Sequence, residues 1–197
     1  EHMSEYVGGY AQRLAWLTGF GGSAGTAVVL ANEAAMFVDG RYTLQVRDQV
    51  DGRLYGYESV PETSVAKWLG EHVGEGARIG YDPWLHSKPW VAAVAKELVA
   101  KAAELVAVET NPVDAVWQDR PAPSPAPALV HDNRFAGEAS EAKRAAVSAW
   151  LAEKKYDAAV ISALDSVAWL LNIRGADVER TPVALSFVIA HADGTAD

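Results

Sequence analysis

A proline-rich segment sets the strongest limit on how this chain can fold. Residues 121–129 read PAPSPAPAL, with proline at four of the nine positions. Proline has a fixed φ and no backbone N–H, so this segment cannot continue a helix or a central strand and favours an extended conformation. We therefore predict two domains, comprising residues 1–122 and 123–197.

Composition and charge exclude several classes of protein. The 197 residues are 50% hydrophobic and 22% charged, which is typical of a globular protein. A net charge of −9, without a basic stripe, argues against a nucleic-acid partner. No apolar run approaches the ~20 residues that span a membrane. The absence of cysteine excludes disulfides and thiolate metal sites and fits a cytoplasmic location.

The hydrophobic pattern of the first domain alternates between strands and helices. Apolar runs separated by Asn32-Glu33 predict a β-hairpin, and Ser87 is placed to cap a helix that carries Pro89 in its first turn. The predicted strands are 26–31, 34–38, 54–59, 77–82 and 105–109. The predicted helices are 11–17, 41–50, 62–74, 90–106 and 112–117. This alternation predicts an α/β fold.

The second domain repeats part of this order. Its predicted elements are a helix at 137–155, a strand at 157–164, a helix at 165–172 and a strand at 183–191. The letters AWL, a glycine-containing turn and a β-rich run occur both from residue 14 and from residue 167. A similarity this short also arises by chance. As a true repeat, it predicts that both domains are incomplete, the first lacking an N-terminal strand and the second its C-terminal part.

The glycine-rich turn GFGGSAGT at 19–26 resembles two functional motifs. Gly19, Gly21 and Ala24 fit the letters of a dinucleotide-binding fingerprint, but a strand-like run follows where that site needs a helix N-terminus. Ser23 fits the hydrolase pattern Gly-x-Ser-x-Gly, but the elbow requires strand, serine, then helix. We therefore predict a structural turn from a helix into a strand, with the Ser23 hydroxyl bonded to the turn's own backbone.

The stretch VDGRY at 38–42 places Asp39, Arg41 and Tyr42 between a predicted strand and a predicted helix. In one interpretation, Asp39 caps the helix and Arg41 pairs with a local carboxylate. In the other, Arg41 projects beyond the strand as a clamp for a carboxylate or carbonyl, which its planar fork suits. The residues alone favour the first interpretation.

Five blocks, taken together, carry a resemblance to a known family: HMSEY, AWLTGFGGSAGTAVV, AAMFVDGRYTLQ, DAVWQDRPAPSP and LDSVAWLLNIRGADVERTPV. They resemble the N-terminal region of the three-domain Xaa-Pro aminopeptidases (aminopeptidase P, metallopeptidase family M24). The resemblance implies two creatinase/prolidase N-terminal-type domains, each a mixed sheet flanked by helices. It also implies a separate catalytic domain with two manganese ions. No histidine or acidic spacing here suits a metal, so we assign this chain no catalytic, cofactor-binding or metal-ligating residue and expect it to be inactive alone.

The resemblance also implies roles for particular residues. It makes Arg41 the residue that contacts the peptide substrate, a peptide with proline at its second position, and it implies a homodimer. Four further residues in its last block are expected to be structural or interdomain: Asp165, Trp169, Arg174 and Asp177. The alternative is a non-catalytic peptide- or protein-binding module of the same fold.

Overall fold

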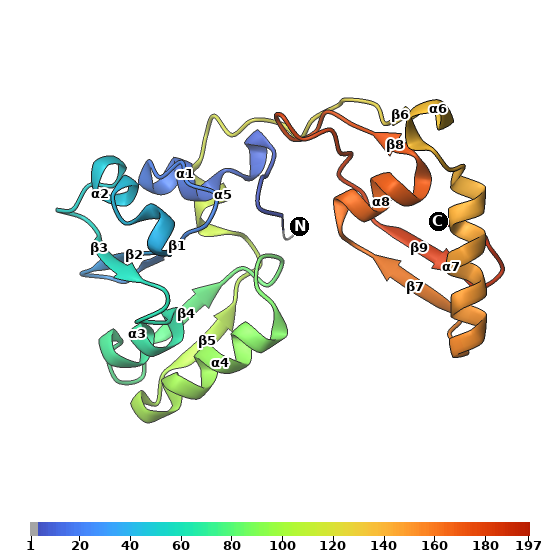
Figure 1. Ribbon diagram of the computed structural model, residues 1–197. Coiled ribbons are helices and arrows are strands. Elements are labelled where there is room, and N and C mark those ends of the chain that lie inside the picture. The colour runs from blue at the N-terminus through green and yellow to red at the C-terminus, as the bar shows by residue number, and fades with distance from the viewer. Residues whose placement is uncertain (1–3) are drawn as a thin grey trace. The chain divides into compact units, whose positions relative to one another are not determined.

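The computed structural model describes residues 4–197, which form two units joined by the proline-rich segment (Figure 1). Unit 1 comprises Gln12–Arg120, and unit 2 comprises residues 4–11 together with Pro121–Asp197. The expected first domain began at residue 1, but residues 4–11 pack with unit 2. There Gly8 lies so close to the carbonyl of Asp177 that a Cβ on Gly8 would be 3.0 Å from it.

Unit 1 contains two sheets. In the first, β1 (Thr26–Val29) pairs antiparallel with β2 (Ala34–Val38), and β2 pairs parallel with β3 (Gly56–Ser59). In the second, β4 (Arg78–Tyr81) pairs parallel with β5 (Glu104–Ala107). The predicted hairpin and the α/β class are therefore confirmed, and the first sheet is mixed.

The helices of unit 1 begin largely where the sequence places their caps. Ser87 accepts a hydrogen bond from Trp90 N with Pro89 in the first turn, as predicted. The helix predicted at 62–74 begins later, at Val65, where Ser64 accepts a hydrogen bond from Lys67 N. The helix predicted at 41–50 is instead two short ones, and the helix predicted through 106 ends at Leu98. The observed helices are η2 (Gly40–Tyr42), η3 (Val99–Lys101), α1 (Arg13–Thr18), α2 (Gln45–Gln49), α3 (Val65–His72), α4 (Lys88–Leu98) and α5 (Pro112–Val116).

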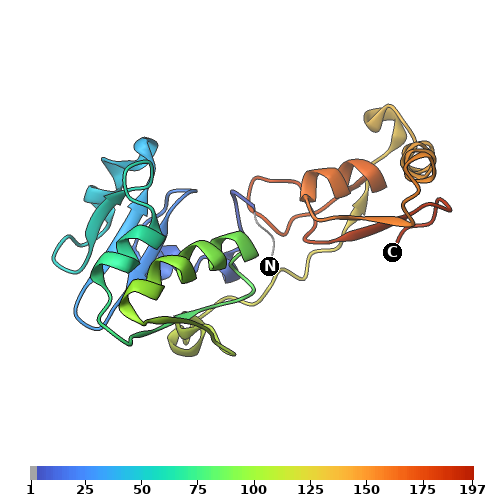
Figure 2. The ribbon, with the colours of Figure 1, turned by 90° about the horizontal axis from the view of Figure 1, so that it is seen from below.

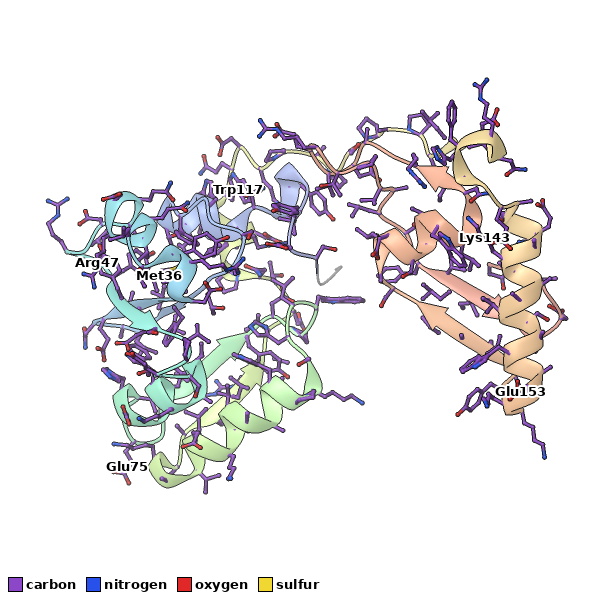
Figure 3. All side chains as sticks on the ribbon, viewed as in Figure 1. Met36, Arg47, Glu75, Trp117, Lys143 and Glu153 are labelled. Carbon is purple, nitrogen blue, oxygen red and sulfur yellow. The ribbon has the colours of Figure 1, made fainter. Side chains whose placement is uncertain are left out.

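Strand β2 is buried on both faces. Ala35 and Phe37 join one hydrophobic cluster with residues of α3 and α4, whereas Met36 and Val38 join a second cluster with Phe20 and residues near α2 (Met36 is labelled in Figure 3). Successive side chains of a strand point to opposite faces, so each cluster takes alternate residues. The C-terminal end of β2 is therefore rigidly held, and it carries the residues that follow.

Unit 2 is built on antiparallel pairs. Strand β7 (Ala158–Ile161) pairs with β9 (Val188–His191), and α7 (Ser140–Lys154) and α8 (Leu164–Leu171) cover one face of this ladder (Figure 2). These elements match the predicted strand, helix, strand order. Four short elements were not predicted, and they are η1 (Gly9–Ala11), β6 (Leu129–Val130), α6 (Asn133–Ala136) and β8 (Ile173–Arg174). Among residues 4–197, no helix is both long and apolar enough to span a bilayer.

Candidate functional site

The candidate site lies where β2 ends. Asp39 has an extended backbone and accepts a hydrogen bond of 2.9 Å from Arg41 N, so it caps the 3₁₀ helix η2. A carboxylate at this position satisfies an N–H group that has no partner inside the helix. The strand end and its cap together fix the backbone of Arg41.

The guanidinium of Arg41 turns back onto Asp39. Its Nη2 lies 2.8 Å from Oδ2 of Asp39 and its Nε 3.1 Å from Oδ1, in the bidentate geometry that suits arginine and carboxylate. These side-chain hydrogen bonds, followed by the one from Arg41 N, lower the pKa of Asp39. The Arg41 side chain nevertheless remains 60% exposed. The ion pair therefore orients the fork while leaving it accessible to solvent.

Tyr42 connects this turn to the glycine-rich turn. Its hydroxyl oxygen accepts a hydrogen bond from Ser23 N at 3.2 Å and lies 2.6 Å from Ser23 Oγ. Its ring packs edge-on against Phe20. The guanidinium carbon of Arg41 lies over the same ring, 5.0 Å from the ring centroid. The hydroxyl of Ser23, predicted to bond the turn's own backbone, thus contacts a side chain 19 residues further along.

The glycine-rich turn leads from a helix to a strand. Helix α1 ends at Thr18 and is capped by Gly19, whose φ of 79° is readily accessible only to glycine, and the chain then enters β1. A side chain at Gly22 would be 2.9 Å from the Tyr42 ring and closer still to Phe20. This order confirms the predicted structural turn, because no helix N-terminus follows to bind a phosphate.

A second turn of unit 1 has the same sequence, which the motifs considered above do not include. Residues 38–41 and 50–53 both read VDGR, and Arg53 binds Asp51 as Arg41 binds Asp39, with Nη2 at 2.6 Å from Oδ2. Arg53 is 89% exposed, and Leu54 stands where the first turn has Tyr42. The motif alone thus produces a local ion pair. Only the first turn is hydrogen-bonded to the glycine-rich turn, through Tyr42 and Ser23.

Two of the residues expected in unit 2 bind the backbone near β8. Arg174 donates to the carbonyls of Ala168 and Ile173, at 3.2 and 2.7 Å. Asp177 Oδ2 accepts a hydrogen bond of 2.8 Å from Leu185 N, whereas its buried Oδ1 has no hydrogen-bond partner among the described residues.

The other two expected residues lie on α8. Asp165 accepts from Ser166 N in the first turn, and Trp169 places its carbonyl and its ring beside the amine of Lys143. All four residues thus make contacts that a structural role requires. None of these contacts, by itself, identifies a ligand.

A metal centre needs several converging ligands. Within residues 4–197, no group of three histidine or acidic side chains is placed to hold a metal ion. The described residues therefore provide no site for the two metal ions, which the resemblance assigns to a separate catalytic domain.

Both parts of the chain match one family description. Residues 9–116 and residues 119–197 each match a creatinase/prolidase N-terminal domain. The two matches account for the repeated order of helix, turn and strand. The chain belongs to the creatinase/prolidase N-terminal domain family.

Its relatives narrow this assignment. The chain is 38% identical, over 95% of its length, to a probable Xaa-Pro aminopeptidase P of Aspergillus clavatus, and 38% identical, over 98%, to aminopeptidase P2 of Arabidopsis thaliana. It covers 29% and 28% of these proteins. A crystal structure of X-prolyl aminopeptidase from Caenorhabditis elegans, described as a cytosolic enzyme with a di-nuclear active site, matches 97% of the chain with a TM-score of 0.87 and 35% identity, and the chain covers 32% of it.

Proposed function

We propose that this chain is the N-terminal region of a Xaa-Pro aminopeptidase, a hydrolase that releases the first residue of peptides with proline at the second position. The match to the Caenorhabditis elegans X-prolyl aminopeptidase over 97% of the chain carries this proposal. The two units supply substrate access and contacts between subunits. The di-nuclear centre, with manganese as its metal, belongs to a part of the protein outside this chain.

Arg41 is the proposed substrate contact within the chain. A guanidinium can donate to a peptide carbonyl or carboxylate, and Asp39 holds this one in a fixed, exposed position at the end of a buried strand. The ring of Tyr42 makes a cation–π contact with this guanidinium, and the Tyr42 hydroxyl is hydrogen-bonded to Ser23. An exposed arginine held in this way loses little freedom when it binds a ligand.

Replacing Arg41 in the full-length enzyme tests this role. With a Xaa-Pro-Xaa tripeptide, Arg41→Ala is expected to lower kcat/KM by about tenfold to a hundredfold, because a charged hydrogen bond contributes about 1.5–3 kcal/mol. Arg53→Ala is the matched control, since it removes the same ion pair from the second VDGR turn. Its kcat/KM should stay at the wild-type value.

The two variants separate a substrate contact from a structural ion pair. Equal kinetics of Arg41→Ala and the wild type would overturn the role of Arg41. A full-length protein that binds such peptides without hydrolysing them, with or without added manganese, would instead support the binding-module alternative. We further propose that the full-length protein is a homodimer located in the cytoplasm. Light scattering can check its oligomeric state, and cell fractionation can check its location.

A further inference from the structure

The glycine-rich turn is held against the chain segment that follows Arg41. The backbone N–H of Gly21 donates to Oε1 of Gln49, in α2, at 2.9 Å. The backbone N–H of Ser23 donates to the hydroxyl oxygen of Tyr42 at 3.2 Å. The turn is therefore bonded at two points to residues 42–49, which begin directly after Arg41.

The side chain of Tyr42 is fixed at both ends. Its hydroxyl oxygen accepts the hydrogen bond from Ser23 N, so its proton is available to Ser23 Oγ, 2.6 Å away. Its ring packs edge-on against Phe20, which is buried. Because tyrosine combines an apolar ring with a polar tip, contacts at both ends define its orientation. The ring is thus a fixed surface beside Arg41.

The guanidinium of Arg41 lies on this surface. Its carbon is 5.0 Å from the centroid of the Tyr42 ring, which is within the distance of a cation–π contact. Asp39 binds the same group at its edge, with Oδ2 at 2.8 Å from Nη2. The ring and the carboxylate contact different parts of the guanidinium, so together they restrict its orientation.

The second VDGR turn forms its ion pair without such a surface. Asp51 binds Arg53 there, but the next residue is Leu54, which has neither an aromatic ring nor a hydroxyl. Leu54 is exposed, and the Arg53 side chain is 89% exposed against 60% for Arg41. The ion pair of a VDGR turn therefore does not account for the presence of Tyr42 at the first turn.

We propose that Tyr42 is a positioning residue for Arg41 and that the glycine-rich turn is its anchor. This role rests on the proposed function, in which Arg41 contacts the peptide. Ser23 holds the Tyr42 hydroxyl, the Tyr42 ring holds the guanidinium, and the contact with the substrate stays with Arg41. An arginine that is oriented before the peptide arrives loses less freedom on binding, which strengthens the complex.

Three variants of the full-length enzyme test this role with a Xaa-Pro-Xaa tripeptide. Tyr42→Phe keeps the ring and removes the hydroxyl, so kcat/KM should fall by about threefold to tenfold, the effect of one neutral hydrogen bond. Ser23→Ala removes one partner of that hydroxyl and should give a smaller loss. Tyr42→Leu copies the second turn, and without the ring it should lower kcat/KM by about tenfold or more.

The separation of KM from kcat distinguishes positioning from a loss of stability. Because Arg41 is assigned to substrate binding, Tyr42→Phe should raise KM and leave kcat near the wild-type value. A structural defect would instead reduce the amount of active enzyme, which lowers the apparent kcat and leaves KM unchanged.

Tyr57 supplies the matched control. Its hydroxyl donates to the carbonyl of Val50 at 2.6 Å, and the guanidinium carbon of Arg47 lies 5.3 Å from the centroid of its ring (Arg47 is labelled in Figure 3). Tyr42 and Tyr57 pack against the same hydrophobic cluster. Tyr57→Phe therefore removes a comparable hydroxyl beside a different arginine, and its KM should equal that of the wild type.

A double variant shows whether Tyr42 acts through Arg41. Adding Tyr42→Phe to Arg41→Ala should change kcat/KM by less than about twofold, because the group that Tyr42 positions is already absent. The full single-variant loss in the double variant would overturn the positioning role. So would a wild-type KM for Tyr42→Phe beside an impaired Arg41→Ala, or an equal rise in KM for Tyr57→Phe. Wild-type kinetics of Arg41→Ala itself would reject the proposed substrate contact and, with it, this role of Tyr42.

Discussion

Helices α1 and α8 carry the same letters, Ala-Trp-Leu, but the structure holds their ends in different ways. Each helix ends at a residue with positive φ, Gly19 at 79° in unit 1 and Asn172 at 51° in unit 2. Glycine reaches this conformation without a steric penalty, and asparagine is among the few other residues that tolerate it. The same turn geometry is thus reached with and without a side chain.

In unit 1 the anchor is an ion network at the start of the helix. Arg13 Nε lies 2.6 Å from Asp114 Oδ1, and Arg120 Nη1 lies 2.8 Å from Asp114 Oδ2. Trp16 of the helix stacks on Trp117, with ring centroids 5.5 Å apart (Trp117 is labelled in Figure 3). Gly19 itself adds no side chain, and the turn beyond it is held by the packing of Phe20 against Tyr42 and by the contact between Ser23 and Tyr42.

In unit 2 the anchor is a buried amine at the end of the helix (Figure 3). Lys143 is 2% exposed, and its Nζ donates to Asn172 Oδ1 at 2.7 Å and to the carbonyl of Trp169 at 3.0 Å. Asn172 is 4% exposed and donates to Asn133 and to the carbonyl of Glu138. A positive charge at a helix C-terminus is favourable, because the last carbonyls there have no partner in the helix.

A glycine turn and a buried polar cluster thus end two helices that share the letters Ala-Trp-Leu in physically different ways. The glycine turn depends on the absence of a side chain, so adding atoms should break it. The polar cluster depends on a complete set of hydrogen bonds, so removing atoms should break it.

The largest effect is expected for Asn172→Gly. Glycine keeps the positive φ but removes three hydrogen bonds and leaves the buried Lys143 with one fewer acceptor. The free energy of unfolding of unit 2 should fall by about 3 kcal/mol. Hydrogen exchange of the α7 and α8 amides measures this loss within unit 2.

Two further variants isolate its cause. Asn172→Ala adds the strain of a Cβ at positive φ and should cost about 1 kcal/mol more than glycine. The double variant Lys143→Met with Asn172→Gly should lose less than the sum of the single changes, since it removes the buried charge together with its acceptor. Additive losses would contradict a coupled cluster.

A smaller effect is expected in the glycine-rich turn of unit 1. Gly22→Ala places a Cβ 2.9 Å from the Tyr42 ring and should lower the free energy of unfolding by about 2 kcal/mol. The control is Gly40→Ala, whose Cβ would have no heavy atom within 4 Å, so its stability should stay within about 0.5 kcal/mol of the wild type. Urea unfolding of the two variants decides between packing and a general intolerance of alanine.

The features that could be predicted from the sequence are those that depend on residues close together in the chain. The hairpin and the caps Ser87 and Asp39 depend on neighbouring residues, and they were predicted. At the candidate site, the pairing of Arg41 with a local carboxylate followed from the same short-range reasoning. These features need little knowledge of the tertiary structure.

Long-range polar contacts could not be predicted in this way. The bond between Ser23 and Tyr42 joins residues that are 19 apart, and the bond between Lys143 and Asn172 joins residues that are 29 apart. Lysine is among the residues least often buried, so α7 gave no sign that one of its polar positions faces inward. The repeat of VDGR at 38–41 and 50–53, by contrast, is visible in the sequence alone, and it identifies Arg53 as the counterpart of Arg41.

The smallest effect concerns the ion network of unit 1 and depends on pH. Hydrogen bonds from Arg13, with its charge and that of Arg120, lower the pKa of Asp114 in the folded state. A lowered carboxyl pKa stabilises the fold above the unfolded value of about 3.9, and this contribution is lost as pH falls through the folded pKa. Asp114→Asn should therefore cost about 1 kcal/mol at pH 7 and almost nothing at acid pH, below the folded pKa. Within residues 4–197, the hydrogen-bond acceptors of Lys143 are the neutral oxygens of Trp169 and Asn172, so its bonds add no carboxylate to this acid dependence. Exchange of the α1 amides between pH 7 and acid pH, in the wild type and the variant, measures the difference, and an equal cost at both pH values would contradict it.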